Sequence, residues 1–212
     1  RYGNIQRLEL ILEAENDSAN RYKVSKQADV LMLFYLFSAE ELGELFTRLG
    51  YPFEYETIPR NVSYYDARSS HGSTLSRVVH AWVLARSDRP RAMGYFAEAL
   101  QSDVGDIQQG TTAEGVHLGA MAGTVDLVQR VSTGIEITGD ILRLNPKLPH
   151  ELERLDMRVR YRGHSLDLRL TRDTLRVRER ERGAAPINLG FNDEVYEFAG
   201  GTRVFKLGTE PT

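Results

Sequence analysis

The apolar residues of this chain change their spacing near Gly134, and this change restricts the fold more than any other feature of the sequence. Before Gly134 they recur at the intervals of an α-helix. After it they alternate with charged residues, most clearly over 155–162 and 166–171. Alternation with period two predicts strands that bury one face. We therefore expect an α+β chain, with a helical part over residues 1–134 and a small antiparallel β-sheet domain over 135–212.

Five helices are expected in the helical part. Ser38 and Glu41 have the spacing of a capping box for a helix that ends at Gly50, and Asp88 precedes a helix with Pro90 in its first turn. Helices in succession with short links indicate an α/α array, which we interpret as part of a barrel. The expected ranges are 24–37, 39–50, 73–85, 88–104 and 111–131.

Three of these segments carry further expectations. The run 30–37 is apolar on nearly all sides, which predicts a buried helix. Pro52 and Pro59 lead us to expect a long, structured connection over 50–70. The last helix should begin at a second capping box, Thr111 with Glu114. It also carries small residues that permit close approach of a neighbouring backbone, namely Gly115, Gly119, Ala120, Ala122 and Gly123.

In the second part, strands are expected over 155–161, 166–170 and 175–177, with 195–198 and 203–207 forming a hairpin. A row of arginines follows the first three strands. Acidic residues such as Asp156 and Asp167 are interleaved with it, so a solvated face or a domain interface is favoured over nucleic-acid binding.

The bulk properties exclude several classes of protein. The chain has 212 residues, 41% of them hydrophobic, with a net charge of −3, which gives no general reason to expect nucleic acid or an anionic membrane as a partner. It has no cysteine, so thiolate catalysis and disulfides are excluded. No apolar stretch is long enough for a membrane span. The first residue is Arg1, which leaves a fragment, a processed product and a trimmed chain as alternatives.

Two short runs have the composition of an anion site. Residues 70–76 read Ser-His-Gly-Ser-Thr-Leu-Ser, and residues 110–117 read Gly-Thr-Thr-Ala-Glu-Gly-Val-His. Each opens an expected helix, where backbone N–H groups have no helical acceptors and an oxyanion such as phosphate is favoured. Two such runs in one helical part suggest a shared polar pocket.

Simpler interpretations stay open for these residues. Ser73 and Thr74 could act only as helix caps, and Glu114 is already explained by its capping box. A catalytic triad of Ser73, His71 and Asp66 is conceivable, but no strand–turn–helix context surrounds it. His117 is too far from His71 in the sequence to form a metal motif with it, and we expect no metal site.

Lys26 and Gln27 precede the most apolar helix of the chain. A lysine at a buried helix start needs a partner. Asp29 or a backbone carbonyl would serve, and so would a hydroxylated ligand, because Lys and Gln together supply several donors and one acceptor.

Five phrases in this order resemble glycoside hydrolase family 65, which contains maltose, trehalose, kojibiose and nigerose phosphorylases together with some hydrolases. They are Lys-Gln-Ala-Asp-Val at 26–30, Tyr-Tyr at 64–65, His-Gly-Ser-Thr-Leu-Ser at 71–76, Gly-Val-His-Leu-Gly-Ala-Met-Ala-Gly at 115–123 and Asn-Pro-Lys-Leu-Pro at 145–149. The resemblance implies that residues 1–134 close an (α/α)6 barrel and that 135–212 form a C-terminal β-sheet domain.

The resemblance also implies roles for individual residues. Lys26 and Gln27 are similar to the pair that holds the glucosyl unit in the −1 subsite. His71, Gly72, Ser73 and Thr74 resemble the family's phosphate loop, with Ser76 as a weaker candidate, and His117 resembles its second phosphate contact. Apart from the resemblance, Glu114 is a possible further residue of the pocket, where it could also act as the base of a hydrolase. The family's general acid lies upstream of the Lys-Gln phrase, so no catalytic residue is assigned in this chain.

We therefore expect the C-terminal portion of an inverting α-glucoside phosphorylase that is inactive alone. Its partners would be a disaccharide, inorganic phosphate as co-substrate and the rest of the same enzyme, in the cytoplasm, with no cofactor, nucleic acid or membrane; a homodimer stays open. A hydrolase of the same family is an alternative. It is disfavoured because no acidic residue lies within 67–79. A free-standing carbohydrate-binding module is a further alternative.

Overall fold

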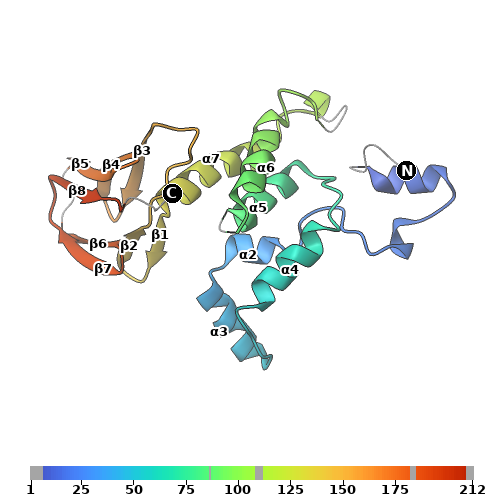
Figure 1. The fold of residues 1–212 in the computed structure, drawn as a ribbon, viewed down its shortest axis with the longest axis horizontal. Helices are drawn as coiled ribbons and strands as arrows, with labels where there is room; N and C mark the ends of the chain where they lie inside the picture. The colour runs from blue at the N-terminus through green and yellow to red at the C-terminus, as the bar shows by residue number, and fades with distance from the viewer. Residues whose placement is uncertain (1–6, 86, 108–111, 182–184, 209–212) are drawn as a thin grey trace. The chain divides into compact units, whose positions relative to one another are not determined.

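The computed structural model describes residues 7–85, 87–107, 112–181 and 185–208, and it has the α+β fold expected from the sequence. The chain divides into two compact units, Arg1–Leu127 and Val128–Thr212. The first is helical, and the second contains all the strands that the structure describes (Figure 1). No helix in the described ranges is both long enough and apolar enough to cross a membrane.

The helical unit is built from short helices joined by turns. Its α-helices are α1 (Leu8–Ala14), α2 (Met32–Leu36), α3 (Ala39–Leu49), α4 (Thr57–Asp66), α5 (Thr74–Leu84), α6 (Arg89–Gln101) and the first part of α7 (Leu118–Thr133). Two 3-10 turns, η1 (Ala19–Arg21) and η2 (Thr112–Glu114), lie between them. α5 is the central helix, since eight of its side chains are buried and it contacts α2, α4 and α6 (Figure 1).

Two of the expected helices have the ends that their sequence signals predict. The Ser38 hydroxyl accepts from the Glu41 backbone and the Glu41 side chain accepts from the Ser38 backbone, so the capping box of α3 is complete. Gly50 ends this helix in the left-handed conformation that glycine adopts most easily. The Asp88 side chain accepts from the Arg91 backbone at the start of α6. Both predictions are confirmed.

The buried helix expected over 24–37 is wrong in extent and in burial. Only α2 is helical, and Leu33, Leu36 and Phe37 are exposed. The preceding residues 24–31 are a bridge followed by bends and turns, because the backbone of Ser25 pairs with the segment around Ser69 instead of with its own helical neighbours. A backbone group bonded to a distant segment cannot also close a helical turn.

The connection expected over 50–70 contains the helix α4, which was not predicted because Pro52 and Pro59 suggested irregular structure. Pro59 is the third residue of α4, where a backbone N–H has no helical acceptor. Proline is therefore tolerated there, and its fixed φ fits the helix.

The last helix begins later than expected. α7 starts at Leu118, while Thr111 of the expected capping box lies outside the described residues. Gly115 has a φ of 124°, which no α-helix contains. The backbone carbonyl of His117 accepts from Ala120 and Met121, so His117 immediately precedes the first turn instead of lying within the helix.

The β unit is a sandwich of two four-stranded sheets. One sheet has the order β1-β2-β6-β7 and the other β3-β4-β5-β8 (Figure 1). β2 and β6 are parallel, whereas the other neighbours are antiparallel. One cluster of buried leucines and aromatic residues draws members from both sheets. The strands are β1 (Glu136–Thr138), β2 (Ile141–Leu144), β3 (Arg154–Tyr161), β4 (His164–Thr171), β5 (Thr174–Glu181), β6 (Ile187–Phe191), β7 (Glu194–Phe198) and β8 (Thr202–Lys206).

The expected hairpin of β7 with β8 is wrong. β7 pairs with β6 and β8 pairs with β5, so the chain passes from one sheet to the other between them. Gly200 and Gly201 make this crossing with φ angles of 111° and 82°, which only glycine adopts at low cost. Phe198 and Phe205 then enter the shared core from opposite sheets. Two consecutive glycines occur both in tight hairpins and in this crossing, so the sequence could not distinguish the two.

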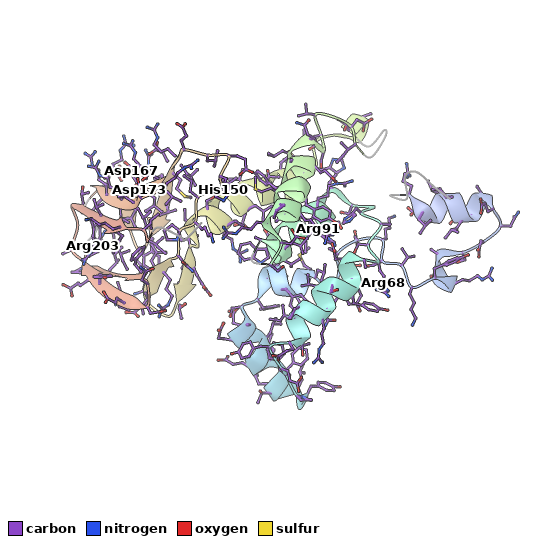
Figure 2. The ribbon with its side chains drawn as sticks, viewed as in Figure 1. Arg68, Arg91, His150, Asp167, Asp173 and Arg203 are labelled. Carbon is purple, nitrogen blue, oxygen red and sulfur yellow. The ribbon has the colours of Figure 1, made fainter. Side chains whose placement is uncertain are left out.

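The arginine row lies on the solvent side of the second sheet. Arg158 bonds to Asp167, which Figure 2 labels, at 3.0 Å, and Arg169 bonds to Asp156 at 2.5 Å. The interleaved acids thus pair with arginines across the strands, as an exposed ion-paired face requires.

Gly123 is the position where α7 approaches α5 most closely among the glycines of the helical unit. A Cβ at Gly123 would lie 2.7 Å from Cγ1 of Val78, whereas one at Gly94 of α6 would meet nothing within 4 Å. We predict that Gly123→Ala destabilises the helical unit by about 1–3 kcal/mol, because a β-branched neighbour cannot move aside. Gly94→Ala should instead stabilise it by about 0.5–1 kcal/mol. Urea unfolding followed by the fluorescence of Trp82, the single tryptophan, measures both, and equal midpoints would contradict the packing described here.

Candidate functional site

Backbone hydrogen bonds join the segment that contains Lys26 and Gln27 to the segment 68–72, which is far from it in the sequence. The N–H of Ser25 donates to Arg68 O at 2.9 Å, that of Ser70 to Ser25 O at 2.8 Å, and that of Gly72 to Lys26 O at 2.7 Å. This short parallel bridge fixes the Lys-Gln phrase beside the loop that leads into α5.

The loop 71–73 presents the N-terminus of α5. His71 has a φ of 55°, a left-handed conformation that turns the chain before the helix. Ser73 is the N-cap residue with extended backbone angles, but its side chain makes no capping hydrogen bond. The Ser73 hydroxyl therefore does not cap the helix, which was the simpler interpretation of this residue. Thr74 is buried and begins the helix.

The imidazole of His71 is held inside the helical unit. Its Nδ1 lies 3.1 Å from Ser76 Oγ, and its Nε2 lies 3.3 Å from the hydroxyl of Tyr95 on α6. The ring nitrogens thus bond to Ser76 and Tyr95 and not to Ser73 and Asp66. The arrangement is not that of a Ser73–His71–Asp66 triad.

Tyr95 connects His71 to a carboxylate. Its hydroxyl donates to Asp66 Oδ1 at 3.3 Å, and Asp66 Oδ2 accepts from Arg91 Nη2 at 2.7 Å; Figure 2 labels Arg91. The ring of His80 packs at 4.5 Å from that of His71 and at 5.2 Å from that of Tyr95. His80 is fully buried and its Nδ1 donates to Ser76 O at 2.8 Å.

These environments change the protonation of both histidines. Burial, with a smaller contribution from the charges of His80 and Arg77, lowers the pKa of His71 to about 4. Burial also lowers the pKa of His80. Burial and the nearby Asp66 charge raise the pKa of Tyr95, so its hydroxyl remains protonated. Near neutral pH this cluster therefore holds neutral rings near the Asp66 carboxylate and the guanidinium groups of Arg91 and Arg77.

Lys26 does not begin a buried helix as expected. It is exposed, and its Nζ lies 3.0 Å from Oε1 of Glu9 on α1. Both side chains reach solvent, so the pair adds little to stability. Burial of Glu9 is the largest influence and acts to raise its pKa, but the hydrogen bond and charge of Lys26, a backbone hydrogen bond and the charge of Arg7 together lower the pKa. Gln27 is also exposed. Both side chains remain accessible to a ligand.

His117 has a different setting from His71. Asp103, just beyond the end of α6, accepts from the His117 backbone N–H at 3.0 Å and lies 2.6 Å from its Nδ1. The hydrogen bond from His117 lowers the pKa of Asp103, which stays ionised. A carboxylate at Nδ1 fixes the ring orientation and directs Nε2 to the opposite side. Within the described ranges Nε2 has no hydrogen-bond partner.

His71 bonds to a residue of α6, and His117 bonds to a residue of the turn that follows α6. His71 contacts Tyr95 and His117 contacts Asp103, eight positions further along, about two helical turns. No hydrogen bond or ring contact among the described residues joins them, so the shared pocket stays a prediction. Two surface hollows, of about 460 Å3 beside Arg176 and about 670 Å3 beside Arg68 (Figure 2), are lined by none of the candidate residues. The side chain of Glu114 lies outside the described residues.

Sequence reasoning missed Tyr95, Asp103 and Arg91, which surround the two histidines. All three belong to α6 or its end. No motif marks them, because they contact the site only through tertiary packing. In the described part of the chain, no group of three or more His, Asp or Glu residues has the arrangement of a metal site.

The comparisons with known proteins agree with one another. A model of the glycosyl hydrolase family 65 central catalytic domain matches residues 1–126, and one of the family's C-terminal domain matches residues 135–198. An uncharacterized glycosyl hydrolase of Mycobacterium tuberculosis H37Rv is 53% identical over 89% of this chain and 14% of its own length. A trehalose 6-phosphate phosphorylase of Lactococcus lactis is 36% identical over 79% of this chain and 22% of its own length.

A solved structure from the human microbiome, whose title names kojibiose phosphorylase, has the same fold. It matches with a TM-score of 0.69 at 22% identity, over 87% of this chain and 22% of that chain. The chain thus spans less than a quarter of each of these three proteins.

The lowered pKa of His71 predicts how stability depends on pH. Between pH 6.5 and about 4 the unfolded chain binds a proton at this residue that the folded chain does not, so stability falls as the pH falls through this window. His80 acts in the same direction. We expect the urea midpoint of the Trp82 signal to be lower at pH 5 than at pH 7, and the difference to be smaller in His71→Gln. His150→Gln, at an exposed histidine of the β unit, should behave as the wild type. An equal pH effect in His71→Gln would contradict the buried, neutral state of His71.

Proposed function

The chain belongs to glycosyl hydrolase family 65, and from this membership we propose that it forms the C-terminal portion of an inverting disaccharide phosphorylase. Residues 1–134 would close an (α/α)6 catalytic barrel, and residues 135–212 would form the C-terminal β domain. Trehalose 6-phosphate and kojibiose phosphorylases among its relatives support phosphorolysis of an α-linked disaccharide. The chain spans only 18–24% of the phosphorylases that it matches, so it would act as part of a longer enzyme, in the cytoplasm and without a metal or organic cofactor.

The observation that carries this proposal is the hydrogen bond from Gly72 N to Lys26 O. It holds the residues proposed for the sugar, Lys26 and Gln27, beside the residues proposed for phosphate, Ser73 and Thr74. A phosphorylase requires such an arrangement, because the attacking oxyanion must lie within reach of the anomeric carbon of the bound sugar. The N-terminus of α5 supplies N–H donors and a favourable dipole for the anion.

In the proposed reaction, a glutamic acid in the remainder of the enzyme protonates the glycosidic oxygen as its bond to the anomeric carbon breaks. Phosphate forms a bond to the same carbon from the opposite face, which inverts the configuration and yields β-glucose 1-phosphate. This chemistry needs one carboxyl group where an inverting hydrolase needs two. Lys26 and Gln27 would bind sugar hydroxyls. Ser73, Thr74 and Nε2 of His117 would bind phosphate oxygens.

A hydrolase of the same family is the second candidate. It would need a free carboxylate near the loop to accept a proton from water. Asp66 is the acidic residue nearest the loop in the sequence, and its oxygens are bonded to Arg91 and Tyr95. This engagement favours phosphate over water as the nucleophile.

We predict that Ser73→Ala combined with Thr74→Ala raises the KM for phosphate about tenfold or more in the complete enzyme, because two hydroxyl donors are lost. The KM for the disaccharide should change less than about twofold, since sugar contacts remain. Initial rates at varied phosphate and varied disaccharide measure both. Ser63→Ala, at an exposed serine of α4, is the matched control. An unchanged phosphate KM would refute the phosphate loop.

Product analysis separates the two candidate reactions. Incubated with its disaccharide and phosphate, the complete enzyme should release glucose 1-phosphate and one free sugar, and little reaction should occur without phosphate. Release of two free sugars in the absence of phosphate, with no sugar phosphate in its presence, would establish the hydrolase instead.

A further inference from the structure

We propose that His71 is a positioning residue of the phosphate loop, held in place by Tyr95 and Asp66, and that it does not itself bind the phosphate. This inference rests on the phosphate site proposed above and assigns α6 a part in shaping it. It also differs from the role that the sequence suggests for His71, which is direct contact with phosphate.

The hydrogen bonds around His71 use both of its ring nitrogens. Asp66 is a carboxylate and accepts only, so the Tyr95 proton goes to Asp66 Oδ1. The Tyr95 oxygen then accepts from Nε2 of His71, and the Ser76 hydroxyl donates to Nδ1. A neutral imidazole in this tautomer has one donor and one acceptor, and both are engaged within the protein.

The surroundings of the ring also disfavour a charged contact with an anion. His71 packs against His80 at 4.5 Å and Tyr95 at 5.1 Å, and its neighbours include the guanidinium of Arg77. A second proton on this ring would add positive charge to a buried cluster that already contains Arg77. An uncharged ring with occupied nitrogens has no donor left for phosphate.

The same bonds explain how His71 acts on the loop. Its backbone has a φ of 55°, which residues other than glycine rarely adopt. The next residue, Gly72, then donates to Lys26 O, and Ser73 follows as the N-cap of α5. Anchoring the His71 ring to Tyr95 therefore fixes the turn that aims Ser73 and the α5 N–H groups at the anion.

Removing the Tyr95 hydroxyl tests this role without touching the phosphate contacts. In the complete enzyme, Tyr95→Phe should raise the KM for phosphate about tenfold, the size expected for loss of one buried hydrogen bond to the loop. The KM for the disaccharide and kcat at saturating phosphate should each change less than about twofold. A merely structural defect would instead lower the active fraction and hence kcat, with both KM values unchanged. Tyr64→Phe, at an exposed tyrosine of α4, is the matched control and should equal the wild type.

The outcomes distinguish this inference from the proposed function. A phosphate-dependent wild type with an unchanged phosphate KM in Tyr95→Phe would overturn the positioning role alone. A wild type that forms no sugar phosphate would overturn the function and the positioning role with it. If Tyr95→Phe loses the native Trp82 fluorescence, Asp66→Asn replaces it, because it weakens the acceptor of the Tyr95 proton and should raise the phosphate KM in the same way. An unchanged phosphate KM in Asp66→Asn would then overturn the role.

Discussion

Three backbone hydrogen bonds between residues 25–26 and 68–72 determine the arrangement of the candidate site. They join the segment that precedes α2 to the turn that precedes α5, and they are made by main-chain atoms. The loop before a helix has several accessible conformations, and pairing it with a second segment selects one of them. The same pairing uses the backbone of Ser25 and Lys26, so the helix that the apolar pattern indicates from residue 24 begins only at Met32.

The two histidines of the candidate site differ because their neighbours differ. His71 is buried among other rings and uses both nitrogens within the protein, whereas His117 bonds to Asp103 through Nδ1 and directs Nε2 away from it. A buried neutral ring can hold a loop in place, and an oriented ring can meet a ligand. α6 supplies Tyr95 and the turn directly after it supplies Asp103, so this region organises the site although no motif lies on it.

The β unit shows how a correct local pattern leaves the topology open. The alternation over β3, β4 and β5 predicts strands with a buried face, and these strands are present. The short strands β1, β2 and β6 lack a long alternating pattern and were not predicted. Gly200 and Gly201 predict a turn in either topology. The burial of Phe198 and Phe205 in one core selects the crossing between sheets, because that arrangement covers both rings.

The sequence by itself determined the local features of this protein: the change from helical to strand periodicity, the capped ends of α3 and α6, and the family, through five phrases spread along the chain. The periodicity and the caps follow from contacts between residues that are near one another in the sequence. The family follows from the residue types themselves, which need no coordinates. Only the tertiary structure decided that residues 24–31 lie outside the helix, that β7 and β8 belong to different sheets, and that Tyr95 and Asp103 hold the two histidines. Each of these depends on a partner that is distant in the sequence: the acceptor of a backbone N–H, the residues that cover an aromatic ring, or the group that bonds to an imidazole nitrogen. Local spacing does not specify that partner.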